Sequence, residues 1–255
     1  MIYLTGFHAI EEAIKAAEAA SAGGQQAGGQ SPGPMFMAKP GPRARELAAL
    51  ALAHKIRVDR VGTHELDRIA PGHRGIALAA DGRLSRLGPE TDLDAFIAGL
   101  GDKKDALALI LDEITDPHNY GAILRSCDQF GAGLVISRNR RTAKHAEVIA
   151  QTSSGASSWV PAAEEANLPR AVEKLKSAGF WIYGADAEGE AVYTRDLRGR
   201  AALVLGGEGS GISRLLKEAC DGLVGIPTAG RLDSLNVSVA AGILLYEAAR
   251  QRRKA

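Results

Sequence analysis

The stretch ALALILDEITDPHNYGAILRSCDQFGA, residues 106–132, contains the pattern that decides the fold. It opens with a nearly continuous apolar run at residues 106–114, which is typical of a strand buried on both faces. A polar break at Asp116-Pro117 follows, and then a helical pattern over residues 119–130. A buried strand that leads into a helix is the repeating unit of a parallel sheet covered by helices on both faces.

The same alternation of strands and helices continues to residue 253. Further strands are expected at residues 133–137, 180–186, 201–207 and 222–227, and further helices at residues 143–152, 168–179, 212–219 and 234–253. Residues 105–255 are therefore predicted to form an α/β domain around a parallel sheet. Ligands of such sheets bind beyond the carboxyl ends of the strands, where polar segments follow three of the predicted strands.

The N-terminal part of the chain, residues 1–82, is predicted to be a smaller α/β domain. Its expected segments are helices at residues 8–18 and 44–55, a short strand at 34–38, and further elements at 56–62, 65–70 and 75–80. Residues 19–34 have the low-complexity sequence AASAGGQQAGGQSPGP, which we interpret as a flexible loop. Residues 83–104 are polar with glycines near both ends, as expected for an interdomain linker.

The composition excludes several classes of protein. The chain has 255 residues, 31 Lys+Arg against 30 Asp+Glu, and 45% hydrophobic residues, which is a globular composition. No apolar run reaches the ~18–20 residues of a membrane helix, and the first residues lack the basic start of a secretory signal. Cys127 and Cys220 have no metal-ligand spacing, so we expect no zinc site, and we expect a reducing, cytoplasmic setting.

The first polar segment, residues 112–132, offers Asn119 and Arg125 as candidate functional side chains. Asn119 can instead be only a helix N-cap, and Arg125 only a solvated charge. The third segment, residues 222–250, brings Ser234 and Asn236 to the start of an apolar helix, where Ser234 can equally act as an N-cap.

The second polar segment, LVLGGEGSGISRLL at residues 203–216, runs from a strand through a glycine-rich turn into a helix. Such a turn exposes backbone N–H groups to a ligand. It lacks the Lys of a Walker loop and lies too late in the chain for a dinucleotide fingerprint. Glu208 inside the turn would repel phosphate, so the turn suits a ligand with a positive group or hydroxyl donors.

Three runs, TDPHNYGAILRSCDQFGA, LVLGGEGSGISRLL and IPTAGRLDSLNVSVAAGILLYEAARQR, resemble in order and spacing the three signature motifs of the SpoU (TrmH-type) RNA ribose 2′-O-methyltransferases of the SPOUT superfamily. Residues 1–82 are similar to the L30e-like RNA-binding domain found in that family. The two-domain form resembles the RlmB-like guanosine methyltransferases of large-subunit ribosomal RNA. The loop at residues 19–34, and Arg74 where Gln is common, depart from the usual pattern in ways that concern the RNA target.

The resemblance implies S-adenosylmethionine as the cofactor, RNA as the substrate, a trefoil knot in the C-terminal domain and a homodimer formed through that domain. The catalytic residues that it implies are Arg125, Asn119, Glu208, Ser234 and Asn236. The cofactor-binding residues that it implies are Gly206, Gly207, Gly209, Ile226, Leu235 and Asn236.

The three segments contain no histidine except His118, so a conventional imidazole base is not expected. Because a guanidinium rarely releases its proton, we expect Arg125 to stabilise the developing oxyanion and to hold a phosphate. The near-zero net charge limits RNA contacts to local patches. The expected RNA-binding residues are Arg125, Arg138, Arg140 and Arg141, with the basic tail at 250–254 as a further candidate.

The sequence leaves three alternative functions to compare with RNA ribose methylation. The same reaction on transfer RNA is the nearest alternative, and a non-catalytic RNA-binding protein of ribosome assembly is the second. Such a protein would be expected to lack Arg125, Glu208 or Asn236, and all three are present. A Rossmann oxidoreductase would need an early GxGxxG, which the first strand of the C-terminal domain does not lead into.

Overall fold

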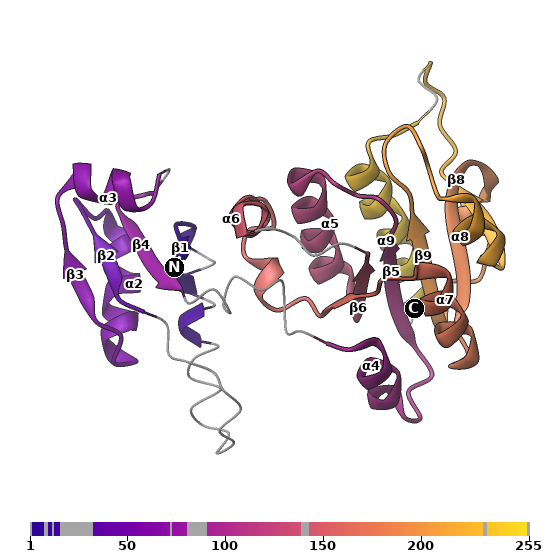
Figure 1. The fold of residues 1–255 in the computed structure, drawn as a ribbon, viewed down its shortest axis with the longest axis horizontal. Coiled ribbons are helices and arrows are strands. Elements are labelled where there is room, and N and C mark those ends of the chain that lie inside the picture. Colours follow the sequence, from indigo (N-terminus) through magenta and orange to yellow (C-terminus); the bar gives the residue numbers. More distant parts are fainter. Residues whose placement is uncertain are drawn as a thin grey trace. The chain divides into compact units, whose positions relative to one another are not determined.

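The structure is a computed structural model, and it describes residues 2–7, 10–11, 13–15, 33–71, 73–80, 91–138, 143–231 and 234–253. The chain divides into two compact units, residues 1–87 with 142–159, and residues 88–141 with 160–255. Each unit has its own sheet (Figure 1). Each also has its own hydrophobic core. Residues 19–32 of the expected loop lie outside the described residues.

The first unit contains a four-stranded sheet in the order β1-β4-β2-β3. Its strands are β1 (Ile2–Leu4), β2 (Met35–Met37), β3 (Val58–Arg60) and β4 (Ile76–Ala80), and its helices are α2 (Pro42–Ala53), α3 (Thr63–Ile69) and α6 (Ala143–Thr152), with the short η1 (Ala156–Ser158). Strand β4 pairs antiparallel with β1 and β2, whereas β2 and β3 are parallel. Helix α2 packs its buried alanines and Leu47 against one face of this sheet, and Leu66 of α3 belongs to a separate cluster with Ala77.

The second unit contains a six-stranded sheet in the order β10-β8-β9-β5-β6-β7, and every neighbouring pair in it is parallel. Its strands are β5 (Ala106–Leu111), β6 (Leu134–Ser137), β7 (Ala162–Glu164), β8 (Trp181–Ala191), β9 (Arg200–Leu205) and β10 (Gly222–Gly225). Its helices are α4 (Leu93–Leu100), α5 (Pro117–Phe130), α7 (Leu168–Ser177), α8 (Arg214–Ala219) and α9 (Val237–Arg252), with the short η2 (Val192–Thr194). The predicted α/β class and parallel sheet are confirmed.

Helices cover the parallel sheet on both faces. Because side chains alternate along a strand, Ala108 and Ile110 of β5 point into one core, which α4, α7 and α8 complete. Helices α5 and α9 lie side by side and contribute no residue to this core (Figure 1). Helix α4 lies within the segment expected as a linker. Its cap Asp92 and its buried Leu93 and Leu100 are a helical signal that the glycines nearby obscured.

The strand order places the carboxyl ends of β5 and β9 next to each other. From β5 the chain moves outward through β6 and β7, and β9 later pairs with the opposite edge of β5. A junction of this kind is where parallel sheets bind their ligands. No helix within the described residues has the length and hydropathy that a membrane span requires.

Candidate functional site

Helix α5 begins beside the carboxyl end of β5, and Asp116 is its N-cap. The two carboxylate oxygens of Asp116 accept hydrogen bonds from the backbone N–H groups of His118 at 3.1 Å and Asn119 at 3.3 Å. Pro117 takes the first helical position, where its missing N–H costs nothing. The alternative of Asn119 as the N-cap is therefore wrong, and the Asn119 side chain is available for another contact.

Helix α9 begins with Asn236 as its N-cap, not with Ser234 as the sequence suggested. The Oδ1 atom of Asn236 accepts hydrogen bonds from the backbone N–H groups of Ser238 at 3.0 Å and Val239 at 3.3 Å. It also accepts one from the Ser238 hydroxyl at 2.6 Å. The cap uses only the oxygen of the side-chain amide, so its nitrogen can donate elsewhere.

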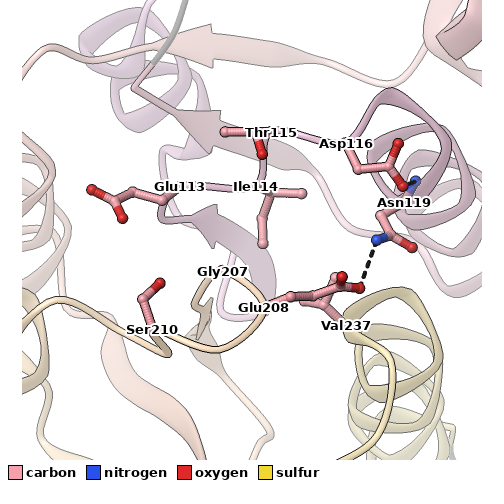
Figure 2. A pocket seen from close by; sticks show the side chains of 9 residues that line it. All are labelled: Glu113, Ile114, Thr115, Asp116, Asn119, Gly207, Glu208, Ser210 and Val237. Atoms are coloured by element: carbon pink, nitrogen blue, oxygen red, sulfur yellow. Dashed lines mark hydrogen bonds between the residues drawn. The ribbon is translucent and has the colours of Figure 1, made fainter.

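Asn119, Glu208 and Asn236 form a closed ring of hydrogen bonds, which we call the Asn-Glu-Asn ring. Nδ2 of Asn119 donates to Oε1 of Glu208 at 2.8 Å, the bond drawn in Figure 2. Nδ2 of Asn236 donates to Oδ1 of Asn119 at 2.9 Å and to the same Glu208 oxygen at 3.0 Å. The three polar segments singled out in the sequence thus meet at one point, although 89 and 117 residues separate Asn119 from its two partners.

The turn that holds Glu208, residues 206–212, depends on glycine for close backbone packing. A Cβ atom on Gly206 would lie 1.9 Å from the carbonyl carbon of Gly211, where no side chain fits. A Cβ atom on Gly207 would lie 2.9 Å from the carbonyl oxygen of Glu113, in the turn after β5. Gly209 has a φ of +83°, a left-handed conformation that favours glycine. The glycines therefore let the turns after β5 and β9 approach each other.

A cavity of about 550 Å³ opens between these two turns (Figure 2), a volume within the range of small-molecule sites. Its lining residues are Glu113, Ile114, Thr115, Asp116, Asn119, Gly207, Glu208, Ser210 and Val237. Three of these carry carboxylates, so the cavity suits a ligand with a positive charge, as expected from Glu208 in the glycine-rich turn. The sequence interpretation missed Glu113 to Thr115, Ser210 and Val237 because nothing but their place after a strand or beside a motif marks them.

Residues 106–246 match the SpoU rRNA Methylase family. The chain belongs to this family. An uncharacterized tRNA/rRNA methyltransferase of Borreliella burgdorferi is 40% identical over 84% of this chain and 96% of its own length. The 23S rRNA (guanosine-2′-O-)-methyltransferase RlmB of Xanthomonas campestris is 42% identical over 83% of this chain and 84% of its own length.

Solved SpoU structures have the same fold. The SpoU methyltransferase AviRb from Streptomyces viridochromogenes, solved in complex with the cofactor AdoMet, matches with a TM-score of 0.72 at 24% sequence identity. The match covers 98% of this chain and 90% of AviRb. The resemblance to the SpoU family inferred from three motifs is confirmed.

The other residues that the SpoU resemblance implied make none of the hydrogen bonds of the ring. Ile226 is half-buried directly after β10, and Ser234 and Leu235 are exposed just before α9. Arg125 is exposed on α5 and is not among the residues that line the cavity. The Arg138 side chain is 38% exposed, whereas Arg140 and Arg141 lie outside the described residues.

The two cysteines of this SpoU protein do not have the character of nucleophiles. Cys127 is fully buried on α5, and burial raises its pKa far above the usual range of a thiol. Burial also raises the pKa of the Cys220 thiol, to about 11. Both groups are therefore thiols rather than thiolates at neutral pH, so they pack rather than react.

Proposed function

We propose that this protein transfers a methyl group from S-adenosylmethionine to the ribose 2′-hydroxyl of a guanosine in 23S ribosomal RNA. The observation that carries the proposal is the Asn-Glu-Asn ring, which joins the three segments that resemble the SpoU motifs. The Xanthomonas relative is named for this reaction, and AviRb was solved with AdoMet. S-adenosylmethionine-dependent RNA methylation is thus supported by both the sequence and the fold.

The residues present fit the cofactor. S-adenosylmethionine supplies an electrophilic methyl group on a positively charged sulfur. The residues proposed to hold it are Gly206, Gly207, Gly209, Ile226, Leu235 and Asn236. The glycines carry no side chain that would cover the turn, Ile226 and Leu235 offer apolar surface, and the carboxylates of the cavity favour a cation.

The remaining residues act on the RNA. A ribose hydroxyl is a weak nucleophile until its developing negative charge is stabilised. Arg125 is proposed to supply positive charge to that oxygen and to an adjacent phosphate. Asn119, Asn236 and Ser234 orient the ribose and the guanidinium, and Glu208 positions the two amides by accepting a hydrogen bond from each.

We propose an L30e-like RNA-binding role for the N-terminal domain, expected at residues 1–82, and a catalytic role for the unit formed by residues 88–141 and 160–255, which includes α4 of the expected linker. The four-stranded mixed sheet with helices on it supports this role. In the catalytic domain, Arg138, Arg140 and Arg141 are proposed to contact phosphates. Ultraviolet crosslinking of bound 23S RNA followed by peptide mapping tests this division. Crosslinks confined to residues after 105 would contradict it.

We propose that the catalytic domain contains a trefoil knot and forms a homodimer. The insertion of β9 between β5 and β8, with α9 packed against α5, supports the knot. A row of exposed apolar side chains along α9 supports the dimer, since Val239, Ile243 and Tyr246 are 50%, 38% and 51% exposed and share one helix face.

Light scattering tests the dimer. Ile243→Glu is expected to convert a dimer into a monomer, because it places a charge in the apolar row. Leu52→Glu, which alters an exposed leucine on α2 of the first unit, is the control and should leave the mass unchanged, since Leu52 is 61% exposed and Ile243 is 38% exposed. A monomeric wild-type protein would contradict the proposal.

The proposed reaction is tested by mapping 2′-O-methylation in the RNA of cells that lack this protein. Loss of one methylated guanosine from 23S RNA is the expected result, and loss from transfer RNA would instead support the alternative substrate. Unchanged methylation in both RNAs would favour a non-catalytic role. We place the reaction in the cytoplasm, in keeping with the two free thiols.

A further inference from the structure

Asp112 follows β5 directly and is fully buried, with 0% of its surface exposed. Its backbone N–H donates to the carbonyl of Leu205 at 2.9 Å, and Leu205 is the last residue before the glycine turn. Its Oδ2 atom accepts a hydrogen bond at 2.8 Å from the backbone N–H of Ser213, the first residue after that turn. A single residue therefore bonds both ends of the turn that carries Glu208.

The second carboxylate oxygen of Asp112 faces a different partner. Oδ1 is buried and has no hydrogen-bond donor among the described residues. The terminal guanidinium nitrogen of Arg138 lies 3.5 Å from it, and the other terminal nitrogen lies 4.0 Å from Glu113. The Arg138 side chain is 38% exposed, whereas that of Asp112 is 1% exposed. The Arg138 guanidinium is thus attracted by the buried charge of Asp112, while part of the side chain remains exposed to solvent.

Burying a carboxylate costs free energy of folding unless the group is paired. A buried Asp112 is therefore better explained by a function of its two oxygens than by packing alone. The glycine turn and Arg138 are the two parts of the site that the proposed function assigns to the cofactor and to an RNA phosphate. A guanidinium that is already oriented loses less side-chain freedom when it binds a phosphate. Asp112 is fully buried and does not line the cavity, yet each of its side-chain oxygens faces one of these two parts.

We propose that Asp112 is a positioning residue with two separate roles, one for each oxygen. Oδ2 fixes the end of the glycine turn for the cofactor, and Oδ1 orients Arg138 for an RNA phosphate. This inference rests on the proposed function, since it presupposes that both substrates bind here.

Asp112→Asn separates the two roles. Its side-chain oxygen can still accept the Ser213 N–H, but the amide carries no charge to attract Arg138. We expect a cofactor dissociation constant within about threefold of wild type and a KM for 23S RNA raised about fivefold to tenfold. The slope of RNA affinity against salt should fall by about one, as expected for one lost phosphate contact. Asp112→Ala loses both roles, so cofactor affinity should also fall by about tenfold or more.

Asp221 provides a matched control in the same unit. Its Oδ2 accepts a hydrogen bond from the backbone N–H of Ile182 at 2.8 Å, and its Oδ1 pairs with Lys176 at 2.7 Å. Asp221→Asn therefore makes the same chemical change at the opposite ends of the strands. It should leave the KM for RNA and its salt dependence unchanged, whatever it does to the melting temperature.

The experiment measures cofactor binding by calorimetry, and RNA KM and kcat by transfer of a tritiated methyl group to a 23S RNA transcript. The double variant Asp112→Asn with Arg138→Ala should show the same KM as Arg138→Ala alone, because Asp112 acts on RNA only through Arg138. Additive effects, or a wild-type KM in Asp112→Asn, would overturn the positioning role. A wild-type protein with no methyl transfer to any RNA would instead refute the proposed function.

Discussion

Asn236 allows the hydrogen-bonded ring to be tested apart from the stability of the fold. Its Oδ1 atom caps α9, whereas its Nδ2 atom donates to Asn119 and Glu208. Serine caps helices about as well as asparagine but has no amide to donate. Asn236→Ser therefore removes the two ring bonds and keeps the cap, while Asn236→Ala removes both.

The expected magnitudes follow from these contacts. A hydrogen bond to a charged group such as Glu208 contributes about 1.5–3 kcal/mol, and one to a neutral amide such as Asn119 about 1 kcal/mol. Because Glu208 and Asn236 are exposed, we take the lower range, about 2–3 kcal/mol in all, or a 30- to 150-fold loss of kcat/KM. Loss of the cap in Asn236→Ala costs about 1 kcal/mol more, which lowers the Tm by about 2–4 °C.

Initial rates of methyl transfer to a 23S RNA transcript, with thermal melting followed by circular dichroism, measure both quantities. Asn236→Ser should lose activity, and Asn236→Ala should in addition melt about 2–4 °C below Asn236→Ser, because only the alanine variant loses the cap. The reasoning is refuted if Asn236→Ser keeps its kcat/KM within about threefold of wild type. It is also refuted if the two variants have the same Tm.

Three further predictions concern other parts of the site. Gly206→Ala should weaken cofactor binding by about tenfold or more in calorimetry, because its Cβ would overlap Gly211, whereas Gly99→Ala in α4, where nothing lies within 4 Å, should bind normally. Arg125→Ala should abolish methyl transfer while cofactor binding survives, and wild-type-like turnover in that variant would remove Arg125 from the mechanism. At pH 8 only about one Cys220 thiol in a thousand is ionised at a pKa of about 11, so mass spectrometry should find it little alkylated by iodoacetamide in the native protein. Rapid alkylation would show that the thiol is not buried as described.

Much of the fold could be predicted because its signals are local. The apolar run of β5, the Pro117 start of α5 and the Gly131 that ends it in a left-handed conformation all lie within one short stretch. The parallel sheet follows from repetition of that unit. Helix α4 was missed because its apolar face is short and glycines flank it, although Asp92 is a good N-cap signal.

The candidate site could be predicted only as three separate segments. Spacing alone favoured Asn119 and Ser234 as N-caps, whereas the structure uses Asp116, three residues earlier, and Asn236, two residues later. A shift of this size changes which side chain reaches the free N–H groups. Glu208 was recognised as unusual, but its two amide partners come from distant helices. Contacts of that range are set by the order of strands in the sheet, which local sequence patterns do not encode.

The distances along the chain within the ring have a practical consequence for anyone who prepares this protein. Helices form from near neighbours in the chain, whereas contacts across 89 and 117 residues require nearly the whole sheet to be in place. A preparation in which the sheet is incomplete would keep much of its helical signal in far-ultraviolet circular dichroism and have no assembled ring. Helical content is therefore a poor measure of the fraction of molecules in which the ring is assembled. Titration with the cofactor is the better measure.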